Sequence, residues 1–417
     1  MNVYSWIILL TLLGGFLLST LSELLNLRAL RNTPPGELEG IYDDDAYEKS
    51  QAYTRANTRF GFVVSAFDLI VLLIVWFSGS FNALDQLISA WGYGPIATGL
   101  IYMGVLVVAK FLLSLPFSLY STFVIEERFG FNRTTPATFI KDIIKGTLLG
   151  AVIGGGVMAL VLSIFAYGGP YAWLYCWGAV TAVTIILQFV APTWIMPLFN
   201  KFEPLEDDEL KQNIMSYARS VKFSLENVFV MDGSKRSGKS NAFFTGFGKH
   251  KRIALFDTLI ANHSPAELVA ILAHEIGHYQ KRHILKGMLL SIAHMGVMLY
   301  LISIFLHHNG LFAAFYMEKT SVYAGLIFFG LLFSPIELVL SLFVNMFSRA
   351  NEFAADRFAA ETCDDGESLI TALKKLSVHN LSNLTPHPFH VFLNYSHPPL
   401  LQRISALRAL RQNNAGK

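Results

Sequence analysis

Seven long apolar segments constrain the fold of this chain more than any other feature of its sequence. A helix needs about 20 residues to cross the hydrocarbon core of a bilayer, and these segments reach that length. The chain as a whole is 53% hydrophobic and only 15% charged, a balance that soluble domains rarely show. We therefore predict a mainly α protein with seven transmembrane helices, at about residues 4–27, 61–79, 95–118, 144–167, 171–197, 285–306 and 322–347.

Charged residues in the connecting loops predict the orientation of these helices. The loops at about 80–94, 168–170 and 307–321 together hold one Lys or Arg, which is Lys319. The other loops are richer in bases, and the first of them contains Arg28, Arg31, Lys49, Arg55 and Arg59. By the positive-inside rule the chain begins outside and ends in the cytoplasm, at a bacterial inner membrane or an endoplasmic reticulum. The first segment lacks a basic leader and a small-residue cleavage site, so we expect it to be retained.

A metal-binding pattern stands before the sixth segment, in A-H-E-I-G-H-Y, where His274, Glu275 and His278 form H-E-x-x-H. Residues four apart share one face of a helix, so the two imidazoles can converge on one ion. Two neutral His nitrogens suit zinc, and the Glu after the first His is placed to activate water. We predict one zinc ion per chain and a hydrolase, on a helix capped by Ser264 and Glu267.

A small sheet is predicted before the zinc helix. N-V-F-V-M at 227–231, N-A-F-F-T-G-F-G at 241–248 and R-I-A-L-F-D at 252–257 have strand-like composition with a glycine-containing turn. Zinc proteases commonly hold a peptide substrate as an extra strand on an open sheet edge. Our candidate edge is formed by Asn241, Ala242, Phe243 and Phe244, and a purely structural hairpin is the alternative.

The same region matches the phosphate-binding loop pattern G-x-x-x-x-G-K-[ST] through Gly233, Gly238, Lys239 and Ser240. That loop requires a helix directly after it, whose first amides hold phosphate. A strand-like aromatic run follows here instead, so we predict no nucleotide. A net charge of +2 without a basic stripe predicts no nucleic-acid partner.

The third metal ligand has to come from elsewhere, because H-E-x-x-H supplies two. S-R-A-N-E-F-A-A-D follows the seventh segment. It is expected on the same side of the membrane as the zinc helix. Glu352 is our candidate ligand, and Asp356, one turn later, can accept a hydrogen bond from a ligating His. His283 lies five residues after His278, off its metal-facing stripe. The other histidines considered as third ligand are His294, His307 and His308. We place them in or beyond a span, away from the cytoplasmic end.

The C-terminal segment carries two further candidates. His397, in S-H-P-P-L-L-Q-R, can donate a hydrogen bond to the oxyanion formed when a peptide carbonyl is attacked. Arg403 can orient Asp356 or the helix of the third ligand. A proline-punctuated loop that only packs the tail onto the catalytic region is the alternative for His397.

Three charged residues stand inside predicted spans, and they are Asp68, Lys110 and Glu337. Charge at that depth is costly unless it faces a wet cavity or a partner. The sequence is equally consistent with a hydrated interior and with mutual neutralisation between helices.

Several motifs together resemble the type I CAAX prenyl protease family of seven-span zinc metalloendopeptidases. The likeness extends from about Glu48 to Leu407. It is carried by Y-E-K-S-Q-A-Y-T-R-A-N-T-R-F-G-F, F-V-I-E-E-R-F-G-F-N, D-G-S-K-R-S-G-K-S-N-A-F-F-T-G-F, R-I-A-L-F-D-T-L, H-E-I-G-H, N-E-F-A-A-D and S-H-P-P-L. The one local departure is Gly238-Lys239, where a more polar pair is expected.

The resemblance implies removal of the C-terminal tripeptide from a prenylated Cys-a-a-X substrate, inside a chamber enclosed by the seven helices. It implies a gluzincin-like protease domain on the cytoplasmic side. Zinc would be bound by His274, His278 and Glu352, with Glu275 activating water and His397 assisting at the oxyanion. The implied partners are a peptide or protein substrate, prenylated or not, and the lipid bilayer.

We divide the chain into four parts. Residues 1–198 hold five spans, 199–284 the sheet and zinc helix, 285–348 two further spans, and 349–417 the third-ligand helix and the C-terminal catalytic segment. Two other functions stay open. One is a general quality-control protease for membrane proteins, and the other is a transporter or scaffold with an incidental metal helix.

Overall fold

The computed structural model describes residues 1–31, 33–38, 44–245, 252–363 and 366–415. Within these ranges seven helices are long and apolar enough to cross a membrane. They are α1 (Val3–Arg28), α2 (Asp44–Phe77), α4 (Pro95–Tyr120), α5 (Pro136–Tyr167), α6 (Ala172–Val190), α10 (His283–Phe305) and α12 (Val322–Thr362). Each predicted segment overlaps one of them, so the prediction of seven spans is confirmed.

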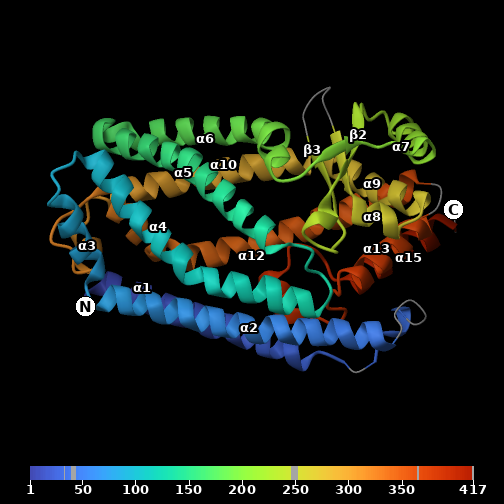
Figure 1. Ribbon diagram of the computed structural model, residues 1–417, viewed down its shortest axis with the longest axis horizontal. Helices are drawn as coiled ribbons and strands as arrows, with labels where there is room; N and C mark the ends of the chain where they lie inside the picture. The colour runs from blue at the N-terminus through green and yellow to red at the C-terminus, as the bar shows by residue number, and fades with distance from the viewer. Residues whose placement is uncertain (32, 39–43, 246–251, 364–365, 416–417) are drawn as a thin grey trace.

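The long helices lie alongside one another, and the two ends of the bundle differ (Figure 1). The short helices α3 (Ser80–Ser89) and α11 (Asn309–Ala313) lie at the end that carries the N-terminus. There the rings of Phe315 and Phe328 stack with centroids 3.9 Å apart, and Trp76 donates an indole hydrogen bond to the carbonyl of Ala314 at 2.7 Å. A packed aromatic core therefore lies at this end.

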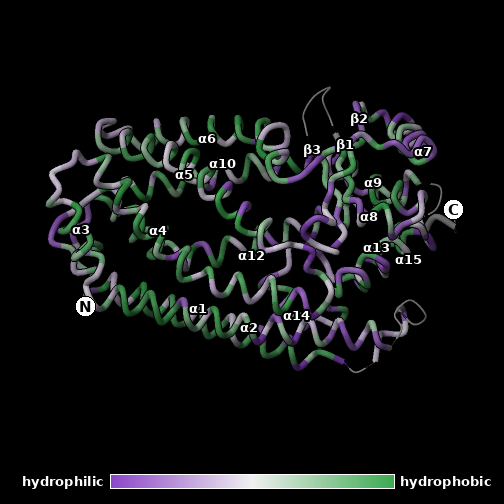
Figure 2. The backbone as a smooth tube through the Cα atoms, in the orientation of Figure 1, coloured by the Kyte–Doolittle hydropathy of each residue, from purple (hydrophilic) through white to green (hydrophobic). Residues whose placement is uncertain are grey.

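The opposite end carries a mixed α/β region, where hydrophilic residues gather (Figure 2). Its strands are β1 (Phe202–Pro204), β2 (Asn227–Met231), β3 (Ala242–Thr245) and β4 (Arg252–Phe256). Its helices are α7 (Asp208–Ser220), α8 (Asp257–Asn262), α9 (Pro265–Gln280), α13 (Gly366–His379), α14 (Pro388–Asn394) and α15 (Leu400–Ala415). The predicted strands are confirmed, and positions 246–248 of the second lie outside the described residues.

The sheet has the strand order β1-β2-β4-β3. Strands β2 and β4 are parallel, whereas β1 and β3 pair antiparallel with their neighbours. Within the described residues β3 pairs on one side alone, so the candidate substrate strand lies at an edge. The three-residue β1 was not predicted, because it is short and ends in Pro204, which is unfavourable in a strand.

Helix α9 is held in place by a predicted cap and a buried core. The Ser264 side chain accepts from the backbone N–H of Glu267, and the Glu267 side chain accepts from the N–H of Ser264, which confirms the capping box. Leu268, Leu272 and Ile276 are buried in the core of the α/β region. The metal-binding pattern therefore sits on a rigid helix.

Charged residues within the spans form pairs. Lys110 on α4 contacts Asp68 on α2 at 2.5 Å, and His294 on α10 contacts Glu337 on α12 at 3.2 Å. The pairing agrees with mutual neutralisation between helices. All four side chains are also at least one-third exposed, so they are not enclosed by packed helices.

Candidate metal centre

The centre forms where α9 and α12 pack closely together. Helix α12 is continuous over 41 residues, so Glu352 lies on an extension of the seventh span rather than on a separate helix. Gly277, between the two histidines of the pattern, faces the backbone of Ala355. A Cβ at Gly277 would stand 3.1 Å from the Ala355 Cα and 3.1 Å from its carbonyl oxygen. The absence of a side chain at Gly277 therefore lets the two helices approach.

This approach brings His274, His278 and Glu352 together. The His274 and His278 Nε2 atoms are 3.1 Å apart. The Glu352 carboxylate oxygens lie 3.4 Å from the His274 Nε2 and 3.3 Å from the His278 Nε2. Within the described residues these three form the one group of three or more His, Cys, Asp and Glu side chains whose possible ligand atoms lie within 4.8 Å of one another. We call these three side chains the ligand group.

The donor set fits a bound cation. Glu352 is 4% exposed, and its Oε2 is buried without a hydrogen-bond partner among the described residues. A buried carboxylate oxygen is costly unless it is paired or coordinates a metal, and the neighbours of this one are the His274 Nε2 at 3.4 Å and the Arg403 Nη1 at 3.8 Å. Burial alone lowers the pKa of His274, but the carboxylates of Asp356 and Glu352 outweigh it and raise that pKa to about 9. The local field therefore favours positive charge among the three side chains.

A carboxylate and a guanidinium support the first histidine. The Asp356 Oδ1 lies 2.8 Å from the His274 Nδ1, and Arg403 on α15 donates two hydrogen bonds to Asp356, at 2.8 and 2.6 Å. With its Nδ1–H directed at a carboxylate, His274 presents the lone pair of Nε2 to the centre. Both predicted supporting residues are thus in contact with the group.

Glu275 directly follows the candidate ligand His274 on α9. Burial raises the pKa of its carboxyl above the ordinary value, although the nearby His274 and His278 oppose this rise. A carboxyl group with a raised pKa is suited to taking up a proton and giving it back near neutral pH.

His397 lies at the rim of the group. Its Nε2 is 3.4 Å from the Glu352 Oε1, and its side chain is 66% exposed. Arg349, one turn before Glu352, donates to the carbonyl of Tyr395 at 2.5 Å, and so ties the segment before His397 to α12. A polar hydrogen next to the ligand group and open to solvent is well placed to meet a substrate carbonyl.

The candidate substrate strand is anchored at its start. Asn380 pairs with Ser240 through two hydrogen bonds, accepting from its N–H at 3.0 Å and donating to its carbonyl at 3.2 Å. Lys239 donates to the hydroxyl of Tyr53 at 2.7 Å and pairs with Glu126 at 3.1 Å. Lys239 is part of the Gly238-Lys239 pair that departs from the expected motif. Its side chain connects the start of the strand region to α2 and to the end of the third span.

The phosphate-binding loop pattern lacks its structural context. Residues Gly233–Lys235 form a single helical turn, and the strand β3 begins at Ala242. Between them the Lys239 ammonium group contacts Tyr53 and Glu126. The helix whose amides would hold phosphate is replaced by a strand.

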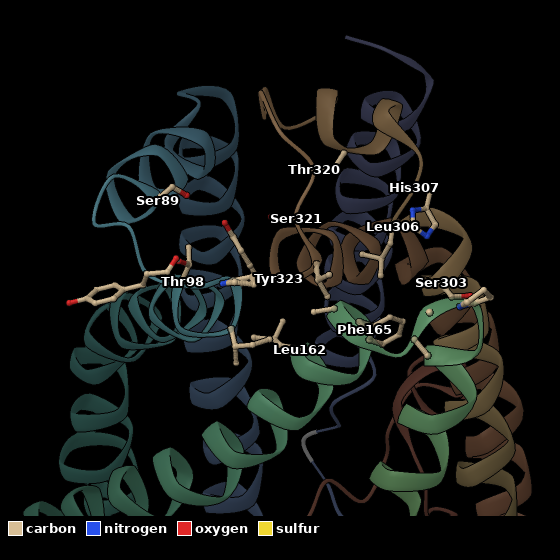
Figure 3. A pocket seen from close by; sticks show the side chains of 18 residues that line it. Ser89, Thr98, Leu162, Phe165, Ser303, Leu306, His307, Thr320, Ser321 and Tyr323 are labelled. Carbon is tan, nitrogen blue, oxygen red and sulfur yellow. The ribbon is translucent and has the colours of Figure 1, made fainter.

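Two of the cavities lined by described residues lie at different places in the bundle. One of about 1030 Å³ lies at the end that carries the N-terminus, lined by His307, Ser321 and Tyr323 among others (Figure 3), and none of its lining residues belongs to the ligand group. Another, of about 700 Å³, lies beside the edge strand and the end of α9. Its lining includes Phe243, Phe244, Tyr279, Ile284 and Leu285.

The remaining histidines stay outside the ligand group. His294 is paired with Glu337, and the ring of His308 lies against Phe305 with centroids 5.5 Å apart. His283 approaches His278, but from behind the ring, with the two Nδ1 atoms 3.1 Å apart. Sequence spacing excluded His283 as a ligand and did not reveal this contact, because the chain turns between the two residues.

Known proteins resemble this chain over nearly its whole length. Residues 23–201 match the CAAX prenyl protease N-terminal region of five membrane helices, and residues 204–411 match peptidase family M48. The CAAX prenyl protease 1 homolog of Oryza sativa subsp. japonica is 36% identical over 403 residues, covering 94% of each chain. CAAX prenyl protease 1 of Saccharomyces cerevisiae is 35% identical over 401 residues, covering 89% of this chain and 88% of the relative.

The fold agrees with these matches. The crystal structure of S. mikatae Ste24p superposes with a TM-score of 0.92 at 33% identity, covering 98% of this chain and 99% of that one. A shared fold at this identity, over both matched regions, assigns the family. The chain is an integral-membrane metalloprotease that belongs to the CAAX prenyl protease 1 family, within peptidase family M48.

Proposed function

We propose that this protein is a zinc endopeptidase that removes the C-terminal tripeptide from prenylated Cys-a-a-X proteins. The observation that carries the proposal is the ligand group of His274, His278 and Glu352, with separations of 3.1, 3.4 and 3.3 Å. Ligand atoms about 2.0–2.1 Å from a tetrahedral zinc ion stand roughly 3.3 Å from one another. Three protein ligands leave the fourth position open, as catalytic zinc sites require.

The catalytic roles follow from the side chains around that group. Zinc held there supplies Lewis acidity, which polarises a carbonyl and makes water more acidic. Glu275, with its pKa raised by burial, takes the proton of the attacking water and passes it to the leaving amine. His397 donates a hydrogen bond to the oxygen that gains negative charge. Asp356 and Arg403 keep His274 in its ligating tautomer.

The substrate peptide lies extended along β3 in this proposal. Backbone groups of Asn241, Ala242, Phe243 and Phe244 offer hydrogen bonds at the sheet edge, which is a common way of holding a peptide. The double hydrogen bond between Asn380 and Ser240 supports this role, because it fixes the strand where it begins.

The membrane arrangement is part of the same proposal. The α/β region faces the cytoplasm, as the loop charges predict, and the four parts of the chain assemble around an interior chamber. The two half-exposed ion pairs, Asp68 with Lys110 and His294 with Glu337, support a wet space between the spans, because exposure of such charges to lipid would be costly.

Cleavage of matched peptides tests the proposal. The purified protein is given a farnesylated Cys-a-a-X peptide and its unprenylated counterpart, and released tripeptide is measured. We expect release from the farnesylated peptide, none from a Glu275→Gln variant, and undiminished zinc in that variant. Equal cleavage of both peptides would favour a general protease, and cleavage by Glu275→Gln at the wild-type rate would refute the catalytic assignment.

A further inference from the structure

The second metal-ligand histidine is backed by another histidine. The Nδ1 of His278 lies 3.1 Å from the Nδ1 of His283, and the ring centroids are 5.1 Å apart with the planes 76° from parallel. His283 is 7% exposed and is the first residue of α10. The contact therefore joins the metal centre to the start of the sixth span.

A sharp turn between α9 and α10 makes this contact. Helix α9 ends at Gln280, and Arg282 adopts a left-handed conformation with a φ of 57°. This conformation is unfavourable for a residue other than glycine. It turns the chain so that the His283 Nδ1 lies against the Nδ1 of His278. A continued helix would instead carry His283 away from that ring, since an offset of five residues is 140° beyond one full turn.

The surroundings of His278 define which of its ring nitrogens carries the proton in the neutral imidazole. Its Nε2 faces His274 and Glu352, so the lone pair of that nitrogen would ligate a metal ion held by the three side chains. A neutral imidazole with a free Nε2 carries its proton on Nδ1. That N–H needs an acceptor, and His283 Nδ1 is the nitrogen within hydrogen-bond distance. His283 must therefore be neutral with its own proton on Nε2.

We propose that His283 is a positioning residue for the metal centre, which accepts a hydrogen bond from the Nδ1–H of His278. It fixes the tautomer and ring orientation of that ligand, as Asp356 does for His274. The proposal rests on the zinc assignment of the proposed function and goes beyond it by adding a residue outside the ligand group. It also makes the turn between α9 and α10 part of the centre.

The two backing partners differ in strength. Asp356 is a carboxylate held by Arg403, and a hydrogen bond to a charged acceptor is about twice as strong as one to a neutral group. His283 is a neutral acceptor, so its removal has the smaller effect. Loss of a residue that orients a metal-ligating histidine typically weakens metal affinity by about 10–100-fold, and we expect about 10-fold here.

Two variants with the same number and branching of side-chain heavy atoms separate hydrogen bonding from packing. In His283→Asn the side-chain Oδ1 can occupy the place of the imidazole Nδ1, so the acceptor is kept. In His283→Leu the branching at Cγ is kept without an acceptor. The dissociation constant for zinc is measured on the full-length protein in detergent by competition with a chromophoric chelator. Thermal midpoints after chelator treatment check that both variants fold.

We expect His283→Leu to weaken zinc binding about 10-fold, and His283→Asn to restore it to within a few fold of the wild type. If Leu binds zinc as tightly as the wild type, or if Asn weakens binding as much as Leu, the hydrogen bond has no positioning role and the inference fails. A wild-type protein that binds no zinc would overturn the proposed function as well, which distinguishes the two failures.

Discussion

Removal of the Arg403 guanidinium tests how the buried charges support the metal centre. Arg403 donates two hydrogen bonds to Asp356, at 2.8 and 2.6 Å, and the Asp356 side chain is 2% exposed. Arg403→Met keeps most of the apolar stem and leaves a buried carboxylate without its cation. Breaking one side of a buried pair costs about 3–5 kcal/mol. For 417 residues this corresponds to a fall of roughly 3–6 °C in thermal midpoint.

The metal affinity should fall with the stability. Without Arg403, Asp356 attracts a proton or holds His274 as an imidazolium, and either state competes with metal at Nε2. We expect zinc affinity to fall by about 10–100-fold, measured by chelator competition in detergent.

A substitution on the same helix provides the control. Arg411 on α15 pairs with Glu367, and both side chains are more than 40% exposed. Surface pairs of this kind contribute little to stability, so Arg411→Met should leave both readouts unchanged. If Arg403→Met and Arg411→Met behaved alike in zinc affinity and thermal midpoint, the buried pair would have no role in the centre.

Two further predictions concern the packing and capping of α9. Gly277→Ala places a methyl group against the Ala355 backbone and should cost about 1–3 kcal/mol while weakening zinc binding. Gly287→Ala, where a Cβ meets nothing within 4 Å, is the control, and equal midpoints would refute the close approach. Glu267 has a lowered pKa, because hydrogen bonds from Lys375 and Ser264 outweigh its burial. Its carboxylate thus stabilises the fold above the ordinary Glu pKa of 4.5, and this contribution is lost as pH falls through the lower folded value. The midpoint difference between wild type and Glu267→Gln should therefore shrink below pH 4.5, and a constant difference would contradict the assignment.

The parts of this protein that were predictable share local causes. The spans follow from apolar segments of sufficient length, and α9 follows from its Ser264–Glu267 capping box. The spacing within H-E-x-x-H requires convergence of His274 and His278 on one helix face. Glu352 could be predicted from the order of the spans, since the seventh span had to end on the side of the membrane where α9 lies.

The parts that were missed depend on contacts between distant segments. The contact of His283 with His278 arises from the left-handed conformation of Arg282, for which the sequence has no glycine signal. The pairing of His294 with Glu337 depends on how α10 and α12 align across the bundle. The role of Gly277 becomes visible when Ala355 is seen against it, and no local rule predicts that neighbour.

The central claim is that a ligand from the seventh span completes a zinc centre begun by α9. Metal analysis of the purified protein tests it most directly, by comparing the wild type with Glu352→Ala and with Glu337→Ala, a change on the same helix outside the centre. We predict one zinc per chain for the wild type and for Glu337→Ala, and loss of zinc from Glu352→Ala. Retention of a full equivalent of zinc by Glu352→Ala would contradict the claim.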